Sequence, residues 1–259
     1  MERQDPLAAL SDHVVICNCN EKVPGIVRHL RACQADLEVV VLVQDRRLWE
    51  GNPAWHLPDS AGVFVVDGCP TVEADLRRVR IAHARAAVIL ADPRQGKLAD
   101  ARSTLVAVAI ERHNPQVHTV MELVSSGSRL QICAREVNEI VCMGDITEKL
   151  IAQSCITPGV DRVFRRLLSN ASDASQVFIT RLPDGFAGLT YRDLVRRAVL
   201  ARAPFTICGF IRTDPEGRQI VVNPHTGVEP GRDSRLERGD SLVVISGSSP
   251  RLEPYLGAE

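Results

Sequence analysis

The sequence lacks the features that mark membrane-spanning, secreted and nucleic-acid-binding proteins. Its longest apolar runs, such as 39–43 and 86–91, fall far below the roughly 20 residues that cross a bilayer. The first twelve residues are polar and contain no apolar signal segment. The net charge is −1, which gives no electrostatic attraction for a polyanion. We therefore expect a cytoplasmic protein with no nucleic-acid partner.

Motifs for metal binding and catalysis are also missing. The eight cysteines form no C-x-x-C pair. Free cysteine is commonly a buried structural residue, and disulfides are rare in the expected compartment. The seven histidines are scattered, and no G-x-S-x-G, H-E-x-x-H or P-loop occurs. This absence agrees with a role in assembly rather than in catalysis.

Strands and helices alternate regularly in the first half of the chain. The predicted strands are continuous apolar runs rich in valine and isoleucine, as in a parallel sheet covered on both faces. This alternation predicts an α/β fold, a Rossmann-like doubly wound parallel sheet. The predicted strands are 14–18, 38–43, 62–68, 86–92, 118–124 and 139–143, and the predicted helices are 21–34, 72–82, 99–113 and 127–137.

The pattern changes after the short polar segment 169–175, which has the composition of a linker. A helix over 190–203 is predicted to begin at the N-cap Thr190. Pro215-Glu216-Gly217 separates two strand patterns and predicts a hairpin. We expect a small α+β C-terminal subdomain with strands at 176–183, 205–214, 219–224 and 241–247.

A bent apolar element joins these two parts. After the strand at 139–143, apolar residues recur at helical spacing, and Thr157-Pro158-Gly159 interrupts them. Such helices cover nothing in their own sheet, so we expect them to contact a second copy of the chain. This gives three predicted parts: 1–144, a helix-turn-helix dimerisation element at 145–170, and 176–259. The expected dimer interface comprises Ile151, Cys155, Val160, Val163, Phe164 and Leu167.

The turn after the first strand argues against dinucleotide binding. Rossmann domains place G-x-G-x-x-G there, so that the backbone can approach a pyrophosphate. In this chain, Asn18 to Val23 contains no glycine, and Glu21 adds negative charge. Asp45 follows the second strand where a ribose-binding acid is expected. A mononucleotide stays an open alternative, with Asn18, Asn20 and Asp45 as its expected contacts.

Three segments together resemble a known family. They are HVVICNCNEKVPGIVRHL, FVVDGCPTVEADLRRVRIAHARAAVILAD and EKLIAQSCITPGVDRVFRRLL. They resemble the RCK domain, the regulator of potassium conductance, in large-conductance calcium-activated channels and tandem-RCK bacterial channels. The end of the chain, with Leu189-Thr190 and Arg238-Gly239-Asp240, is similar to the RCK C-terminal subdomain.

The resemblance implies a ligand-sensing gating module rather than an enzyme. Its expected partners are itself, as a homodimer, tetramer or octamer ring, and a potassium channel pore at the inner face of the membrane. Ligand binding would shift the equilibrium between two ring states. Two alternatives are a soluble nucleotide-dependent Rossmann enzyme and a structural ring module that senses nothing.

The family resemblance also implies a position for a divalent cation. Acids are expected after the fourth strand, at the start of the next helix and at the end of the fifth strand, where Asp92, Asp100 and Glu122 stand. Hard cations prefer such oxygen ligands. The loop 93–97 adds positive charge, however, and Val124 stands where a second acid would help. We rank calcium or a similar cation first as ligand, adenine mononucleotides second and NAD last.

Overall fold

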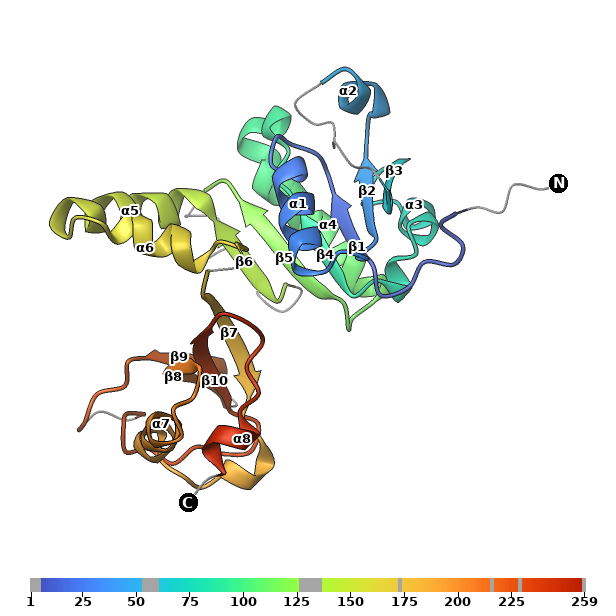
Figure 1. Ribbon diagram of the computed structural model, residues 1–259. Coiled ribbons are helices and arrows are strands. Elements are labelled where there is room, and N and C mark those ends of the chain that lie inside the picture. Colours follow the sequence, from blue (N-terminus) through green and yellow to red (C-terminus); the bar gives the residue numbers. More distant parts are fainter. Residues whose placement is uncertain are drawn as a thin grey trace. The chain divides into compact units, whose positions relative to one another are not determined.

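The computed structural model describes residues 6–52, 61–125, 137–171, 174–214, 217–227 and 230–257. The chain divides into two compact units, Met1–Ile156 and Thr157–Glu259, which are shown in Figure 1. This boundary falls inside the predicted helical element, so the three-part division stays a prediction. None of the described helices is both long and apolar enough to cross a membrane.

The first unit contains the predicted parallel sheet. Its strand order is β3-β2-β1-β4-β5-β6, with every pair of neighbours parallel. The order reverses between β1 and β4, as in a doubly wound fold, and a crevice is expected at the carboxyl ends of these two strands. All six strands confirm the predicted fold: β1 Val14–Cys17, β2 Val39–Val43, β3 Val63–Asp67, β4 Ala86–Ile89, β5 His118–Leu123 and β6 Glu139–Cys142.

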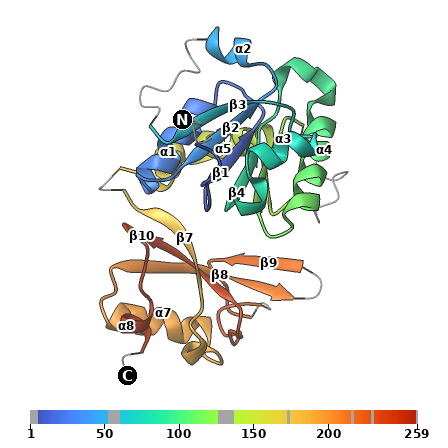
Figure 2. The same cartoon turned by 90° about the vertical axis from the view of Figure 1, so that its right-hand side faces the viewer.

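Helices cover both faces of this sheet. Alternate residues of one strand enter different cores: Val15 packs in the cluster that contains Ile110, whereas Ile16 packs in the cluster that contains Val27. Figure 2 shows α1 on one side of the strands and α3 and α4 on the other. The helices are α1 Val23–Cys33, α2 Arg46–Glu50, α3 Glu73–Arg78 and α4 Ala99–His113, with 3-10 helices η2 Ile81–His83 and η3 Pro93–Leu98.

The helices of the first unit differ from prediction at two places. The predicted helix 127–137 lies almost entirely outside the described residues. The short helix α2 was not predicted, because five residues are too few for a periodic pattern. Asp45 caps it by accepting a hydrogen bond from the Arg47 backbone nitrogen at 3.0 Å.

The element after β6 has the predicted break. Helix α5, Met143–Ile156, follows β6 directly, and α6 spans Val160–Leu167. Between them, Gly159 has φ 95°, a left-handed conformation that glycine adopts without steric cost. All residues of the two helices are described, and none of them is buried.

The second unit also contains a four-stranded antiparallel sheet, ordered β7-β10-β8-β9. Thr190 and Asp193 form a reciprocal capping box at the start of α7, which confirms the predicted N-cap. The predicted hairpin is confirmed by pairing of Asp214 with Gly217, although the turn residues 215–216 lie outside the described chain. The elements are β7 Gln176–Arg181, η5 Asp184–Phe186, α7 Tyr191–Leu200, β8 Phe205–Asp214, β9 Gly217–Val222, β10 Ser241–Ser246 and α8 Glu253–Leu256.

Candidate functional site

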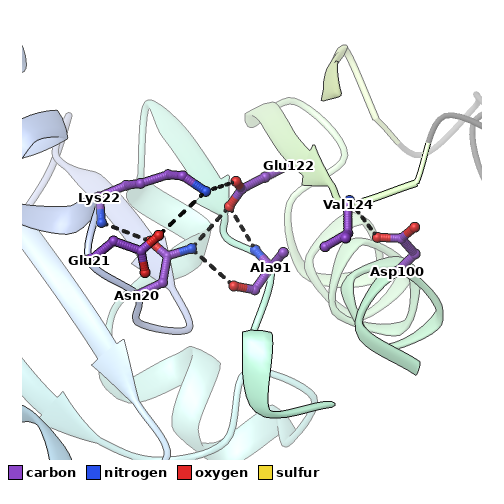
Figure 3. Close-up of polar contacts among 7 residues, drawn as sticks. All are labelled: Asn20, Glu21, Lys22, Ala91, Asp100, Glu122 and Val124. Atoms are coloured by element: carbon purple, nitrogen blue, oxygen red, sulfur yellow. Dashed lines mark hydrogen bonds and ion pairs between the residues drawn. The ribbon is translucent and has the colours of Figure 1, made fainter. Parts of the chain in front are cut away.

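The candidate site lies at the carboxyl edge of the parallel sheet, around the ends of β1, β4 and β5. Figure 3 shows Asn20 and Lys22 from the turn after β1, Ala91 from the loop after β4, and Glu122 near the end of β5. This is the edge where a doubly wound sheet forms its ligand crevice. The geometry of these side chains therefore decides what the crevice can hold.

Glu122 is the centre of this network. The residue is only 7% exposed. Its Oε2 atom accepts hydrogen bonds from Asn20 Nδ2 and from the Ala91 backbone nitrogen, both at 3.1 Å. Its Oε1 atom pairs with the Lys22 ammonium group. A buried carboxylate needs such partners, because an unpaired charge in the interior is strongly unfavourable.

Asn18 and Asn20, the expected nucleotide contacts, bond to the protein itself. Asn18 Nδ2 donates to the Leu90 carbonyl oxygen at 2.9 Å, and Asn20 Nδ2 donates to the Ala91 carbonyl oxygen at 3.0 Å. Asn20 Oδ1 accepts from the Lys22 backbone nitrogen at 3.0 Å. Both residues are buried. Their amide groups therefore fasten the turn after β1 to the loop after β4.

The start of α1 is poorly suited to an anion. Its N-cap, Lys22, makes no side-chain cap, and Pro24 in the first turn has no N–H to donate. The backbone nitrogen of Asn18 donates to the Leu42 carbonyl, and that of Val23 donates to the Asn20 carbonyl, both at 3.2 Å. A phosphate at a helix N-terminus needs such donors to be available. The turn has used several of them internally.

Asp45, the third expected nucleotide contact, has a structural partner as well. It is exposed, and its carboxylate caps α2 as described above. An N-cap role explains an acid at this position without any ribose. The prediction that Asn18, Asn20 and Asp45 bind a nucleotide stays a prediction.

Asp92, the first of the expected metal ligands, is bound by an arginine. It is buried, and it accepts from the Arg94 side chain at 2.8 Å (Nε) and 3.0 Å (Nη2). Burial alone raises the pKa of Asp92, but the hydrogen bonds and charge of Arg94 outweigh burial and lower that pKa below its ordinary value. Burial also raises the pKa of Cys19 to about 12, so this thiol is protonated at neutral pH.

Asp100 belongs to a separate network. It is buried in the first turn of α4, and it accepts from the backbone nitrogens of Val124 at 2.8 Å and Ser125 at 3.1 Å. It thus holds the segment that leaves β5. Within the described ranges, no group of three or more His, Cys, Asp or Glu side chains is placed to hold a metal ion. Asp92, Asp100 and Glu122 each have their own protein partners, so a metal site formed by the three stays a prediction.

The six expected interface residues lie on α5 and α6. Ile151, Cys155, Val163 and Phe164 are exposed, and Val160 and Leu167 are partly exposed. The sequence prediction omitted Ile156 and Leu168, which are 78% and 77% exposed. Their position beside the break and at the end of the helical pattern gave no periodic signal. Each helix therefore presents large apolar side chains that its own unit does not cover.

The fold combines a Rossmann-like doubly wound sheet with two following helices and a small antiparallel sheet. Residues 9–121 match the family model of the calcium-activated potassium channel slowpoke-like RCK domain. This part of the chain is therefore similar to an RCK domain. The human SLO3 gating ring has the same fold, with a TM-score of 0.66 and 16% identity, over 95% of this chain and 46% of that chain.

Two curated relatives carry the names of ion channels. The chain is 24% identical over 246 residues to the probable ion channel SYM8 of Pisum sativum, which covers 91% of this chain and 26% of the relative. It is 23% identical over 248 residues to the calcium-gated potassium channel TvoK of Thermoplasma volcanium, which covers 94% of this chain and 65% of that protein. The chain thus spans about a quarter of the plant relative.

Proposed function

We propose that this chain is the cytoplasmic gating module of a potassium channel. In this role it pairs with a second copy through α5 and α6, and the pairs form a ring at the inner face of the membrane. The RCK match and the named channel relatives support the assignment. The observation that carries it is that no residue of α5 or α6, both fully described, is buried within the chain.

Helix α6 supports the pairing most directly. Val160, Val163, Phe164 and Leu167 follow the spacing of one helix face. The opposite positions are charged, and Asp161 pairs with Arg165 one turn along the helix at 3.0 Å. An amphipathic helix normally buries its apolar stripe against its own domain. Here Phe164 stays 49% exposed, which favours burial against another chain.

Helix α5, in the first unit, also combines exposed apolar residues with an ion pair along the helix. Ile146 and Ile151 are more than half exposed, whereas Lys149 and Asp145 form an ion pair at 2.8 Å. Interfaces between identical subunits are more apolar than ordinary protein surface. A second copy of the chain offers the same two helices, so a symmetric pair can cover both. This is the association that we expect.

One alternative role is favoured by the crevice. The polar residues at the carboxyl edge form hydrogen bonds with one another. This is the arrangement expected of a structural ring module that binds no ligand. This module and a ligand sensor share the same assembly but differ in their response to ligands. A nucleotide-dependent enzyme has less support, because the turn after β1 lacks the glycines that a pyrophosphate needs and several of its backbone donors are already used.

The test of this proposal has two parts. Sedimentation of the purified chain should show a dimer or a larger even-numbered assembly, and a monomer at micromolar concentration would remove the assembly claim. The gene's flanking sequence should encode a pore segment with a T-V-G-Y-G-like filter, or the cell should contain a separate pore subunit that co-purifies with this chain. Assembly without any pore partner would leave the structural ring module as the better assignment.

A further inference from the structure

The side chain of Lys22 is 42% exposed, and its ammonium group lies at the carboxyl edge of the sheet, against a buried carboxylate. It pairs with Glu122, a residue from β5 that lies 100 positions further along the chain. It also lies 3.9 Å from Glu21 Oε1. Figure 3 shows this ammonium between the two carboxylates. One positive charge thus stands next to two negative ones, and one of these is buried.

We propose that Lys22 is a tethered cation that takes the place of a metal ion at this edge, and that its pairing with Glu122 leaves no free ammonium there to attract a phosphate. This inference does not depend on the gating role. Under this proposal, Lys22 determines which ligands can bind at the carboxyl edge. Sequence reasoning considered Glu122 as a metal ligand but did not identify its partner.

The oxygen atoms around the ammonium support the first half of the proposal. Glu122 Oε2 already accepts two N–H groups, from Asn20 and Ala91, so Oε1 is the atom that depends on Lys22. Calcium and similar cations bind clustered carboxylate oxygens. A cation at the position of Nζ would meet Glu122 Oε1 and the Glu21 carboxylate. The lysine supplies that positive charge from within the chain.

The charges around the turn support the second half. A phosphate approaching the start of α1 would meet Glu21, and the ammonium that would attract it is already paired with Glu122. The Lys22 backbone nitrogen donates to Asn20 Oδ1 rather than to a ligand. Electrostatic attraction for an anion is therefore largely cancelled. While the Lys22–Glu122 pair is intact, Glu122 already has its cation and Lys22 offers little net attraction to an anion.

Removing the ammonium should create a cation site. Without it, Glu122 Oε1 is a buried charge with no cationic partner, an arrangement that is strongly unfavourable. A calcium ion can restore the balance by bridging Glu122 and Glu21. The expected result is thus a gain of binding, which simple damage to the fold would not produce.

The experiment is calorimetry with calcium chloride on the whole chain and three variants. Lys22→Met should bind calcium on the order of tenfold or more tightly than the wild type, a gain of about 1.4 kcal/mol or more. Lys22→Arg keeps a positive charge and should behave like the wild type. Lys22→Met combined with Glu122→Gln removes the charged ligand and should lose the gained binding.

Two results would overturn the proposal. One is a folded Lys22→Met protein, verified by circular dichroism, that gains no calcium binding. The other is a wild-type protein that already binds calcium through Glu122 with the same affinity as Lys22→Met. If Lys22→Met is unfolded without calcium, refolding on calcium addition supports the proposal, and failure to refold contradicts it.

Discussion

The side chains at the carboxyl edge of the parallel sheet differ from those on the helices α5 and α6 in burial and in bonding. At the sheet edge, where this kind of fold usually binds a small ligand, Asn18, Asn20 and Glu122 are buried and bonded to the protein itself. On α5 and α6, apolar side chains such as Ile156 and Phe164 lie exposed. The polar side chains of the expected ligand site already have hydrogen-bond partners within the protein. The apolar side chains of the two helices, in contrast, are not covered by the chain itself.

This contrast indicates where binding free energy is available. A buried polar group that already has its partners gains little by exchanging them for a ligand. An exposed apolar side chain gains roughly 1.5–3 kcal/mol when it is fully buried. The chain therefore has more to gain from association with another protein than from a nucleotide at its crevice. Four sets of substitutions test whether the two regions are as separate as this comparison implies.

The largest effect is expected from charging α6. In Phe164→Asp with Leu167→Asp, association should weaken by roughly 3 kcal/mol or more, on the order of a hundredfold in Kd. Sedimentation equilibrium measures this change. Val199→Asp, at a 70% exposed position on α7 outside the predicted interface, is the matched control and should leave assembly unchanged. A doubly charged variant that sediments like the wild type would refute the interface.

A smaller effect, of a different kind, is expected at the crevice. Asn20→Ala removes donors from the Ala91 carbonyl and from Glu122, and the loss should lower the free energy of unfolding by about 1–3 kcal/mol. Urea denaturation measures it, with the more exposed Glu21→Ala as control. Assembly should not change. If Asn20→Ala also dissociates the pair, the crevice and the helices are coupled, and the comparison fails.

The predictions from sequence succeeded where the signal was local. The six strands of the first sheet follow from apolar runs, and the capping box at Thr190 follows from residues three positions apart. Thr157-Pro158-Gly159 likewise marked the break between α5 and α6. Each of these features depends on neighbours in the chain, so the residues themselves carry the information.

The candidate site could be predicted only in part. The strand pattern placed Glu122 at the correct edge of the sheet, because carboxyl ends of parallel strands meet there. It could not show that Lys22 pairs with Glu122, since two charged residues 100 positions apart have no shared pattern. Whether a carboxylate is available to a metal depends on such partners. The sequence likewise indicated that Arg94 adds positive charge near Asp92, but not that its side chain bonds to that carboxylate.

The stability of the first unit should depend on pH through a histidine buried in its interior. His13 is fully buried, and its Nε2 atom lies 2.9 Å from the Val79 carbonyl oxygen. Burial lowers the pKa of His13, with smaller lowering effects from Arg80 and His83, while the Val79 hydrogen bond and Glu38 oppose the shift.

The sign of this effect follows from proton uptake. In the unfolded chain His13 takes up a proton near the ordinary histidine pKa of 6.5, but in the folded chain it does so only at lower pH. Stability should be complete above that value and fall as pH drops, by up to about 1.4 kcal/mol per pH unit. Urea midpoints at about pH 7 and about pH 5.5 measure the slope. His13→Gln should flatten it, whereas the exposed His118→Gln should not.

The smallest effect is expected at Asp45. Asp45→Ala removes the N-cap of the short helix α2 and should cost about 0.5–1 kcal/mol of stability, whereas Asp45→Asn keeps a capping side chain and should cost less. Calorimetry with NAD should show no binding to the wild type or to either variant, because the turn after β1 offers no glycine and several of its donors are used. Tight NAD binding that disappears in Asp45→Ala would show that this edge does accept a dinucleotide. The conclusion that the sheet edge has less binding free energy available than α5 and α6 would then be wrong.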